Sequence, residues 1–418
     1  MVQGKTIALA AVCVVAASAI LISSGAGARS GAAAPSVPAS TWNARAAATY
    51  LDQRQSWWES WPKSARDHGT VCVSCHTALP YALARPELRA ILHENDATTN
   101  ERKILADVTT RVRSWSEVKP YYGDTTPGGR TKAIESRGTE AVLNALVLAS
   151  RDERSGVVSA EARQAFANMF ALQQTAGEDA GAWTWLNFGL RPWEARTSVY
   201  FGAALAAIAV GMEPQNYAKS GDIQPNVERL RAYLQEHVDQ PLWKRVLRRD
   251  DPQLFNRAML LWASAKLPGL IPPDEQQSIV ATLRDAQEPD GAWRFTSLGH
   301  WRSDASESAD AAGDGLATGL VAYALEQAGS RPNEQHVVRA LAWLASHQES
   351  ATGMWRAWSL NKQRDPATNV GKFMSDAATA YAVLALSAAA PSSRVERTAR
   401  DSKAEADLLA SHRPPLRQ

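Results

Sequence analysis

The chain has 418 residues, and its 45 basic side chains are nearly balanced by 43 acidic ones. The resulting net charge of +2 gives no reason to expect nucleic acid or an anionic membrane surface as the main partner. The length allows two average domains, and 45% of the residues are hydrophobic, but the 15 tryptophans are an unusual number that needs an explanation.

The N-terminal segment predicts an exported protein. Lys5 precedes an almost wholly apolar run over residues 6–22, and Ala26-Gly27-Ala28 offers a small-x-small cleavage site, so residues 1–28 have the layout of a secretory signal peptide. Residues 29–41 are rich in Ala, Ser, Pro and Gly and predict a flexible leader. We therefore expect a periplasmic or secreted protein. Because the apolar run is near the shortest length that spans a membrane, an uncleaved N-terminal membrane anchor is the alternative.

The next feature is Cys72-Val73-Ser74-Cys75-His76, a C-x-x-C-H motif. This spacing is typical of c-type haem attachment, in which two thiols bond to one haem and the following imidazole binds its iron. It predicts one covalent haem c, held by Cys72 and Cys75, with His76 as the proximal iron ligand. We expect the other ring nitrogen of His76 to donate to a backbone carbonyl or a water.

Other chemistries of a C-x-x-C pair remain open. The two thiols could form a disulfide in an oxidising compartment, or act as a redox dithiol. A zinc site would need further Cys or His nearby, but the next His is His93 and the remaining cysteine, Cys13, lies in the apolar run.

The tryptophans mark an internal repeat of six units. One Trp per unit recurs at intervals of 50 to 70 residues, at Trp58, Trp115, Trp185, Trp243, Trp293 and Trp355. The stretches before these positions have apolar residues at steps of three and four and predict amphipathic outer helices over 42–55, 101–113, 160–174, 226–238, 275–287 and 334–348. The stretches after them are apolar nearly all round and predict inner helices over 77–92, 139–149, 197–210, 255–265, 316–328 and 377–389.

Six such hairpins can bury their inner helices against one another if the row closes into a ring. The sequence therefore predicts an all-α fold, an α/α toroid with inner and outer helix rings over residues 42–390. An open helical solenoid is the alternative, and the lack of alternating strand patterns argues against a sheet. Residues 391–418 are a polar tail.

The loops show a family resemblance. Gln287-Glu288-Pro289-Asp290-Gly291-Ala292-Trp293 resembles the QW repeat of the squalene-hopene cyclase and prenyltransferase superfamily, with looser copies at 348–355 and at 174–183. The resemblance implies an α/α toroid able to enclose a large apolar cavity, in which the Gln caps a helix end. The superfamily's chemistry does not carry over. Its D-x-D-D acid is not matched by Asp304, Glu307, Asp310 and Asp314, and its zinc-binding Cys has no counterpart after Cys75.

In a toroid all outer-to-inner connections open at one mouth, so the haem should lie there, between the first unit and its neighbours, units two and six. A Met as the iron's sixth ligand gives a closed centre of raised potential, a His a closed centre of lower potential, and a vacant position a site for small ligands. The candidates are Met354, Met374 and His300, and Met374 is favoured because it begins the inner helix beside the haem helix. The alternatives are that the two Met residues fill the core and that His300 is a surface loop residue.

Further polar residues are placed near the same mouth. Tyr121 and Tyr122 are considered for a propionate or a distal ligand, and packing beside a turn is the alternative. Lys63, Arg66 and Arg137 are considered for the propionates, and solvated surface charges are the alternative. Glu194 and Arg196 lie beside the start of the third inner helix. Asp314 is expected to cap the fifth inner helix.

Two main functions follow. The first is an exported monohaem c-type cytochrome-like protein that exchanges electrons with a redox partner protein or a small-molecule donor or acceptor. The second is a haem-dependent oxidoreductase with an apolar, terpenoid-like substrate in the toroid cavity. A haem-free toroid that binds or processes lipid or glycan is a further alternative, and neither a G-x-S-x-G, a phosphate-binding loop nor an HExxH motif is present.

Overall fold

A computed structural model describes residues 42–123, 131–238, 252–301 and 313–390. The signal peptide, leader and polar tail predicted at 1–28, 29–41 and 391–418 lie outside these ranges. Among the helices that the ranges contain, none is both long and apolar enough to cross a membrane.

The described residues form twelve α-helices in six outer–inner pairs. The inner helices are α2 (Ala78–Ile91), α4 (Thr131–Ser155), α6 (Val199–Met212), α9 (Gln253–Lys266), α11 (Gly315–Gln327) and α13 (Phe373–Ala388). The outer helices are α1 (Ala44–Ser60), α3 (Thr99–Arg113), α5 (Ala160–Ala171), α7 (Gln224–His237), α10 (Pro273–Asp285) and α12 (Gln335–Ser346). Short 3-10 turns occupy Asp67–Gly69, Arg196–Ser198, Tyr217–Lys219, Phe295–Leu298 and Val370–Lys372. Within the same residues there is no strand, only two isolated bridges, Ala65 with Val71 and Leu190 with Glu194.

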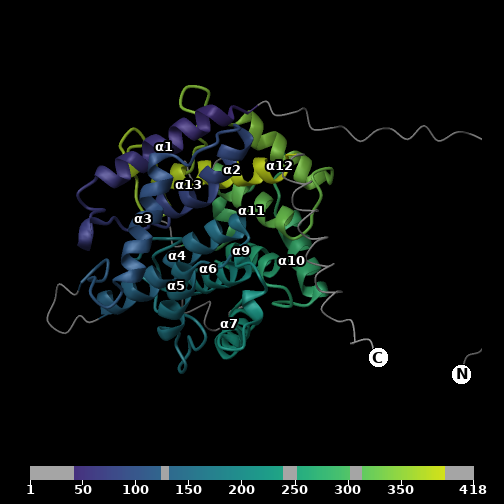
Figure 1. The fold of residues 1–418 in the computed structure, drawn as a ribbon. Coiled ribbons are helices and arrows are strands. Elements are labelled where there is room, and N and C mark those ends of the chain that lie inside the picture. Colours follow the sequence, from purple (N-terminus) through teal and green to yellow (C-terminus); the bar gives the residue numbers. More distant parts are fainter. Residues whose placement is uncertain (1–41, 124–130, 239–251, 302–312, 391–418) are drawn as a thin grey trace, which may run out of the picture. The chain divides into compact units, whose positions relative to one another are not determined.

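The inner helices close into a ring. Each contacts the next in chain order, from α2 through α4, α6, α9 and α11 to α13, and α13 contacts α2. Figure 1 shows them surrounded by the outer helices. The closed α/α toroid is therefore confirmed, and the open solenoid is wrong.

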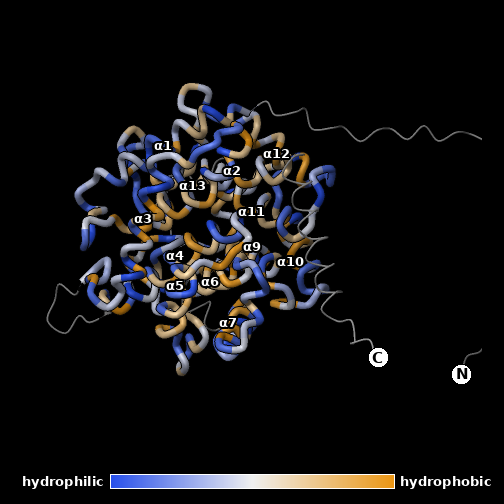
Figure 2. Tube along the Cα trace, in the orientation of Figure 1, coloured by the Kyte–Doolittle hydropathy of each residue, from blue (hydrophilic) through white to orange (hydrophobic). Residues whose placement is uncertain are grey.

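Composition explains which helices are inside. In α6 all but two of the residues are buried, as expected for a helix that is apolar all round, whereas α10 buries only Ile279 and Leu283. Figure 2 shows the hydrophobic colour concentrated on the inner helices α6 and α9. Trp262 of α9 also reaches Tyr381 of α13, with ring centroids 6.3 Å apart, so aromatic side chains fill part of the interior.

The QW-like segment joins neighbouring hairpins. The side-chain amide of Gln287 donates to the carbonyl of Gly291, 2.8 Å away, and to that of His336 in the first turn of α12, also 2.8 Å away. The indole N–H of Trp293 donates to Leu283 O of α10, at 2.8 Å. The amide therefore attaches to the first turn of the next outer helix, while the indole bonds to the preceding one.

The same device recurs twice. Gln348 donates to Gly353 O and to Asn43 O, the N-cap of α1, so it links the last hairpin to the first. In the third hairpin the equivalent amide belongs to Gln173, which donates to Gly181 O and Asn226 O. The sequence assignment of this role to Gln174 was wrong by one residue, because the loop is longer and its spacing does not fix the register.

The glycine of the motif is required by close packing. Gly291 has φ +99°, and a Cβ there would lie 2.6 Å from the carbonyl oxygen of Arg339 in α12. Residues with a side chain rarely adopt this backbone conformation, and α12 leaves no room for a Cβ atom at this position.

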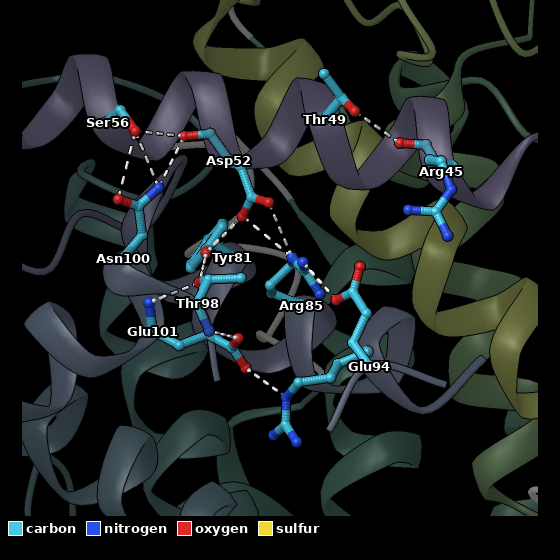
Figure 3. A network of polar contacts seen from close by, with 11 residues as sticks. Arg45, Thr49, Asp52, Ser56, Tyr81, Arg85, Glu94, Thr98, Asn100 and Glu101 are labelled. Atoms are coloured by element: carbon cyan, nitrogen blue, oxygen red, sulfur yellow. Dashed lines mark hydrogen bonds and ion pairs between the residues drawn. The ribbon is translucent and has the colours of Figure 1, made fainter. Parts of the chain in front are cut away.

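A polar network fixes α2, the helix that follows the C-x-x-C-H motif, to its outer neighbours (Figure 3). Asp52 of α1 accepts a hydrogen bond from Tyr81, at 2.7 Å, and from Arg85 Nε, at 3.1 Å. Arg85 also pairs with Glu94 at 2.7 Å. Because Arg85 is buried, these partners compensate its charge and hold α2 in one register against α1.

Candidate functional site

The C-x-x-C-H segment connects α1 to α2, as predicted, and its backbone is held on both sides. Cys72 N donates to Ser64 O at 3.0 Å, and Cys72 O accepts from the indole N–H of Trp58 at 2.9 Å. Trp58 lies in the last turn of α1 instead of the loop expected from the repeat. Ser74 Oγ accepts from Ala78 N at 3.1 Å, which satisfies a free N–H at the start of α2.

Both cysteines are buried free thiols, so this structure contains no disulfide between them. Burial raises the pKa of Cys72 to about 11 and that of Cys75 well above its ordinary value. Both are therefore protonated at neutral pH. In the described ranges no group of three or more His, Cys, Asp and Glu side chains is arranged to hold a metal ion.

A cavity of about 280 Å³ opens beside this segment, at the N-terminal ends of inner helices. Connections of the first, second, third and sixth hairpins line it, which agrees with the prediction that these loops share one mouth. Its walls are mainly aromatic and apolar, from Trp58, Trp61, Phe188, Leu190, Trp193, Val370, Gly371, Phe373 and Met374. Its polar lining comes from His76, Tyr122, Arg191, Glu194, Ser359, Asn361 and Arg364.

His76 lines the cavity and is neutral. Its ring stacks on Phe373 with centroids 3.8 Å apart and meets the edge of Trp58 at 5.1 Å. Burial, with smaller contributions from the positive charges of Arg54 and Arg364, lowers the pKa of His76 to about 3. A neutral imidazole has one nitrogen with a free lone pair, which a metal ligand needs.

The hydrogen bonds around His76 show which of its two ring nitrogens has the lone pair. The Thr77 hydroxyl donates to Asp376 Oδ2 at 2.7 Å, so its oxygen can only accept from His76 Nδ1, 2.8 Å away. Nδ1 therefore carries the proton and Nε2 has the lone pair. The partner is thus a side-chain hydroxyl, and the expected backbone carbonyl or water was wrong.

Asp376 is the centre of a buried cluster from the first and last hairpins. Its carboxylate accepts hydrogen bonds from Tyr50 at 2.9 Å, from Arg54 Nε at 2.6 Å and Nη2 at 3.0 Å, and from Thr77. Burial raises the pKa of Asp376, while Arg54, Thr77 and Tyr50 act to lower it. Arg54 also donates to the Asn369 side chain at 2.7 Å.

Of the sixth-ligand candidates, the structure brings Met374 into the cavity with His76. Met354 is buried but does not line the cavity. His300 is exposed and does not line it either.

The other predicted polar residues divide into two groups. Tyr122 and Glu194 line the cavity, whereas Tyr121 accepts a hydrogen bond from Val73 N at 3.3 Å, and Arg196 is exposed outside the cavity. Asp314 caps α11, as expected, by accepting from Ala317 N at 2.8 Å. The acidic residues Asp304, Glu307 and Asp310 lie outside the described residues.

The structure locates the three basic residues that were considered for the propionates. Lys63, Arg66 and Arg137 do not line the cavity, and the guanidinium of Arg137 lies over the Trp115 ring instead, 4.4 Å from its centroid. Arg191 and Arg364 do line it. Both come from long connections whose folding no local sequence pattern indicates.

Glu194 is electrostatically coupled to the motif. Burial raises the pKa of Glu194 to about 7, with Lys132 opposing. Its negative charge in turn contributes to the raised pKa of both Cys72 and Cys75. The two thiols are therefore within electrostatic reach of a cavity residue, although neither lines the cavity itself.

The residues present fit a haem c. Two thiols stand at the required spacing beside the cavity, and the adjacent imidazole, which lines the cavity, is neutral with an unprotonated Nε2. A thioether lines the cavity as well. Aromatic walls suit a planar apolar macrocycle, and two arginines suit its propionates.

No protein-family model and no curated protein matches the chain. Among solved structures, two glycosidase variants are similar at 10% and 11% sequence identity, each with a TM-score of 0.44 over 82% of this chain and 97% of the glycosidase.

Proposed function

We propose that this chain is an exported monohaem c-type cytochrome-like protein, with the haem attached through Cys72 and Cys75 and ligated by His76. The observation that carries the proposal is the state of His76, whose Nδ1 proton is bound by Thr77 while the ring lines an aromatic cavity shared with Met374. Nothing in the charge balance suggests nucleic acid as a partner. A redox partner protein or a small-molecule donor or acceptor would exchange electrons at this mouth.

Each lining group has a role in this proposal. Haem supplies one-electron chemistry when bound. His76 binds through a neutral imidazole, and Met374 is the candidate for the sixth position, where a thioether raises the reduction potential. Arg191 and Arg364 would pair with the propionates, and the tryptophan and phenylalanine walls exclude water.

The test is expression of the full chain with a cytochrome c maturation system. We expect a coloured product that keeps its haem through denaturing electrophoresis and gains the mass of one haem. Cys72→Ser combined with Cys75→Ser should abolish the covalent attachment. His76→Gln should change the absorption spectrum, whereas His300→Gln, at an exposed histidine outside the cavity, should not. A colourless wild-type protein would refute the proposal.

Carbon monoxide separates electron transfer from the oxidoreductase alternative. A ferrous protein whose iron has two protein ligands keeps its spectrum in carbon monoxide, whereas an open position gives a shifted Soret band. The shifted band would favour catalysis on an apolar, terpenoid-like substrate in the same cavity.

A second candidate is a haem-free toroid that processes glycan, and Glu194 favours it. A carboxyl group whose burial raises its pKa to about 7 is suited to general acid catalysis. Glycoside hydrolysis ordinarily uses a pair of carboxyl groups, however, and Glu194 is the single carboxylate among the described residues that line the cavity. Hydrolysis of a glycan by haem-free protein, lost in Glu194→Gln, would establish this candidate instead.

A further inference from the structure

The His76 side chain is oriented by residues from opposite ends of the chain. Thr77 follows His76 directly, but Asp376, to which Thr77 donates, is 299 positions further along the chain. Asp376 belongs to α13, and its main charged partner, Arg54, belongs to α1. We call the contact between the first and last hairpins the seam. The series of hydrogen bonds that runs from Arg54 through Asp376 and Thr77 to His76 therefore crosses the seam.

The series has one consistent direction of hydrogen bonding. Arg54 has only donors, so Asp376 accepts on both oxygens, at 2.6 and 3.0 Å. The Thr77 hydroxyl hydrogen is used on Asp376, which leaves its oxygen to accept from His76 Nδ1. Asp376 and Thr77 are 1% and 3% exposed, so water does not offer the ring a competing partner at this point.

We propose that Thr77 and Asp376 are positioning residues for His76, which keep the proton on Nδ1 and leave Nε2 as the ligand atom, so that closure of the ring sets the state of the axial ligand. The inference rests on the proposed haem site. A side chain that donated to Nδ1 would not keep the proton on this nitrogen. Without the Asp376 carboxylate, the Thr77 hydroxyl could rotate and donate to the ring in this way. The carboxylate also makes the ring more electron-rich through the hydroxyl, which stabilises the oxidised metal and lowers the reduction potential.

The test uses Thr77→Val, which keeps the branched shape and removes the hydroxyl, with Thr77→Ser as the matched control that keeps it. In the haem-loaded full chain, the valine variant should have a higher midpoint potential than wild type, and the serine variant a potential close to that of wild type. Equal potentials in all three proteins would overturn the inference while the proposed haem site stands.

A second measurement does not need the haem. Nitrogen-15 NMR of the haem-free full chain reports which ring nitrogen of His76 carries the proton. We expect Nδ1–H in wild type and in Thr77→Ser, and a shift toward Nε2–H in Thr77→Val and Asp376→Asn. A wild-type His76 protonated on Nε2 would overturn the inference. If no protein takes up haem, the proposed function fails, but this measurement still decides the role of Thr77 and Asp376.

Discussion

Replacing Arg54 by Met should weaken the fold at the seam. The substitution removes two hydrogen bonds to Asp376 and two to Asn369, which lie between 2.6 and 3.0 Å, and a guanidinium placed 4.6 Å from the centroid of Trp57. It leaves the Asp376 carboxylate, 1% exposed, with only Tyr50 and Thr77 as donors. Removing one partner of a buried ion pair costs about 3–5 kcal/mol because the other charge stays buried and uncompensated.

A loss of that size is a large part of the roughly 5–15 kcal/mol that stabilises most proteins, so urea unfolding should resolve it easily. Adding Asp376→Asn to Arg54→Met should recover about 1–2 kcal/mol, because the neutral amide still bonds Tyr50 and Thr77 without a buried charge. Arg331→Met is the control, since the exposed pair of Arg331 with Glu334 should contribute less than about 1 kcal/mol. An Arg54→Met loss no larger than that of the control would refute the reasoning.

Three further outcomes are expected. Gly291→Ala should lower the free energy of unfolding by roughly 1–3 kcal/mol more than Gly329→Ala. Both glycines have φ near +98°, but only Gly291 has backbone atoms within 3 Å of the added Cβ. Equal losses of the two variants in urea unfolding would contradict this. Burial raises the pKa of Glu194 from 4.5 to about 7, so the native state binds the extra proton, and wild-type stability should fall relative to Glu194→Gln as pH rises through this window. Urea midpoints on both sides of the window check this, and a constant difference between the two proteins would count against it. Met374→Ala should let the ferrous haem protein bind carbon monoxide with a shifted Soret band, whereas Met354→Ala should not; no change in either variant would exclude Met374 as the sixth ligand.

The helices and their closure into a ring could be predicted from the sequence because the pattern responsible is local. An inner helix such as α6 is apolar on every face, and nothing but other helices can cover it. The largest difference in helix bounds is α4, which begins at Thr131, eight residues before the predicted start at 139, and ends at Ser155, six residues after the predicted end at 149. Its first and last turns are too polar to look like an inner helix. Smaller differences are the end of α1, five residues later than predicted, and the start of α13, four residues earlier. The C-x-x-C-H motif is also local, so its place between α1 and α2 could be predicted from the chain order.

The surroundings of the site could not be predicted in the same way. Arg191 and Arg364 reach the cavity from long connections, and their sequence neighbours have no periodicity that fixes the direction of a side chain. Asp376 has the appearance of an ordinary acidic residue in the first turn of a helix, and only the folded ring shows that it is buried against Arg54. Met374 was within reach of prediction because ring closure alone places the start of α13 beside the first hairpin.

The seam differs from the other contacts between hairpins in its chain connectivity. Five of the six contacts between neighbouring hairpins join units that follow each other in the chain, but the contact of the first with the sixth has no covalent connection and closes a loop of about 300 residues. That closure depends on side chains such as Arg54 with Asp376 and Gln348 with Asn43. A haem bound by Cys72, Cys75 and His76 of the first hairpin and by Met374 of the last would bind only the closed ring, and would therefore stabilise it by mass action.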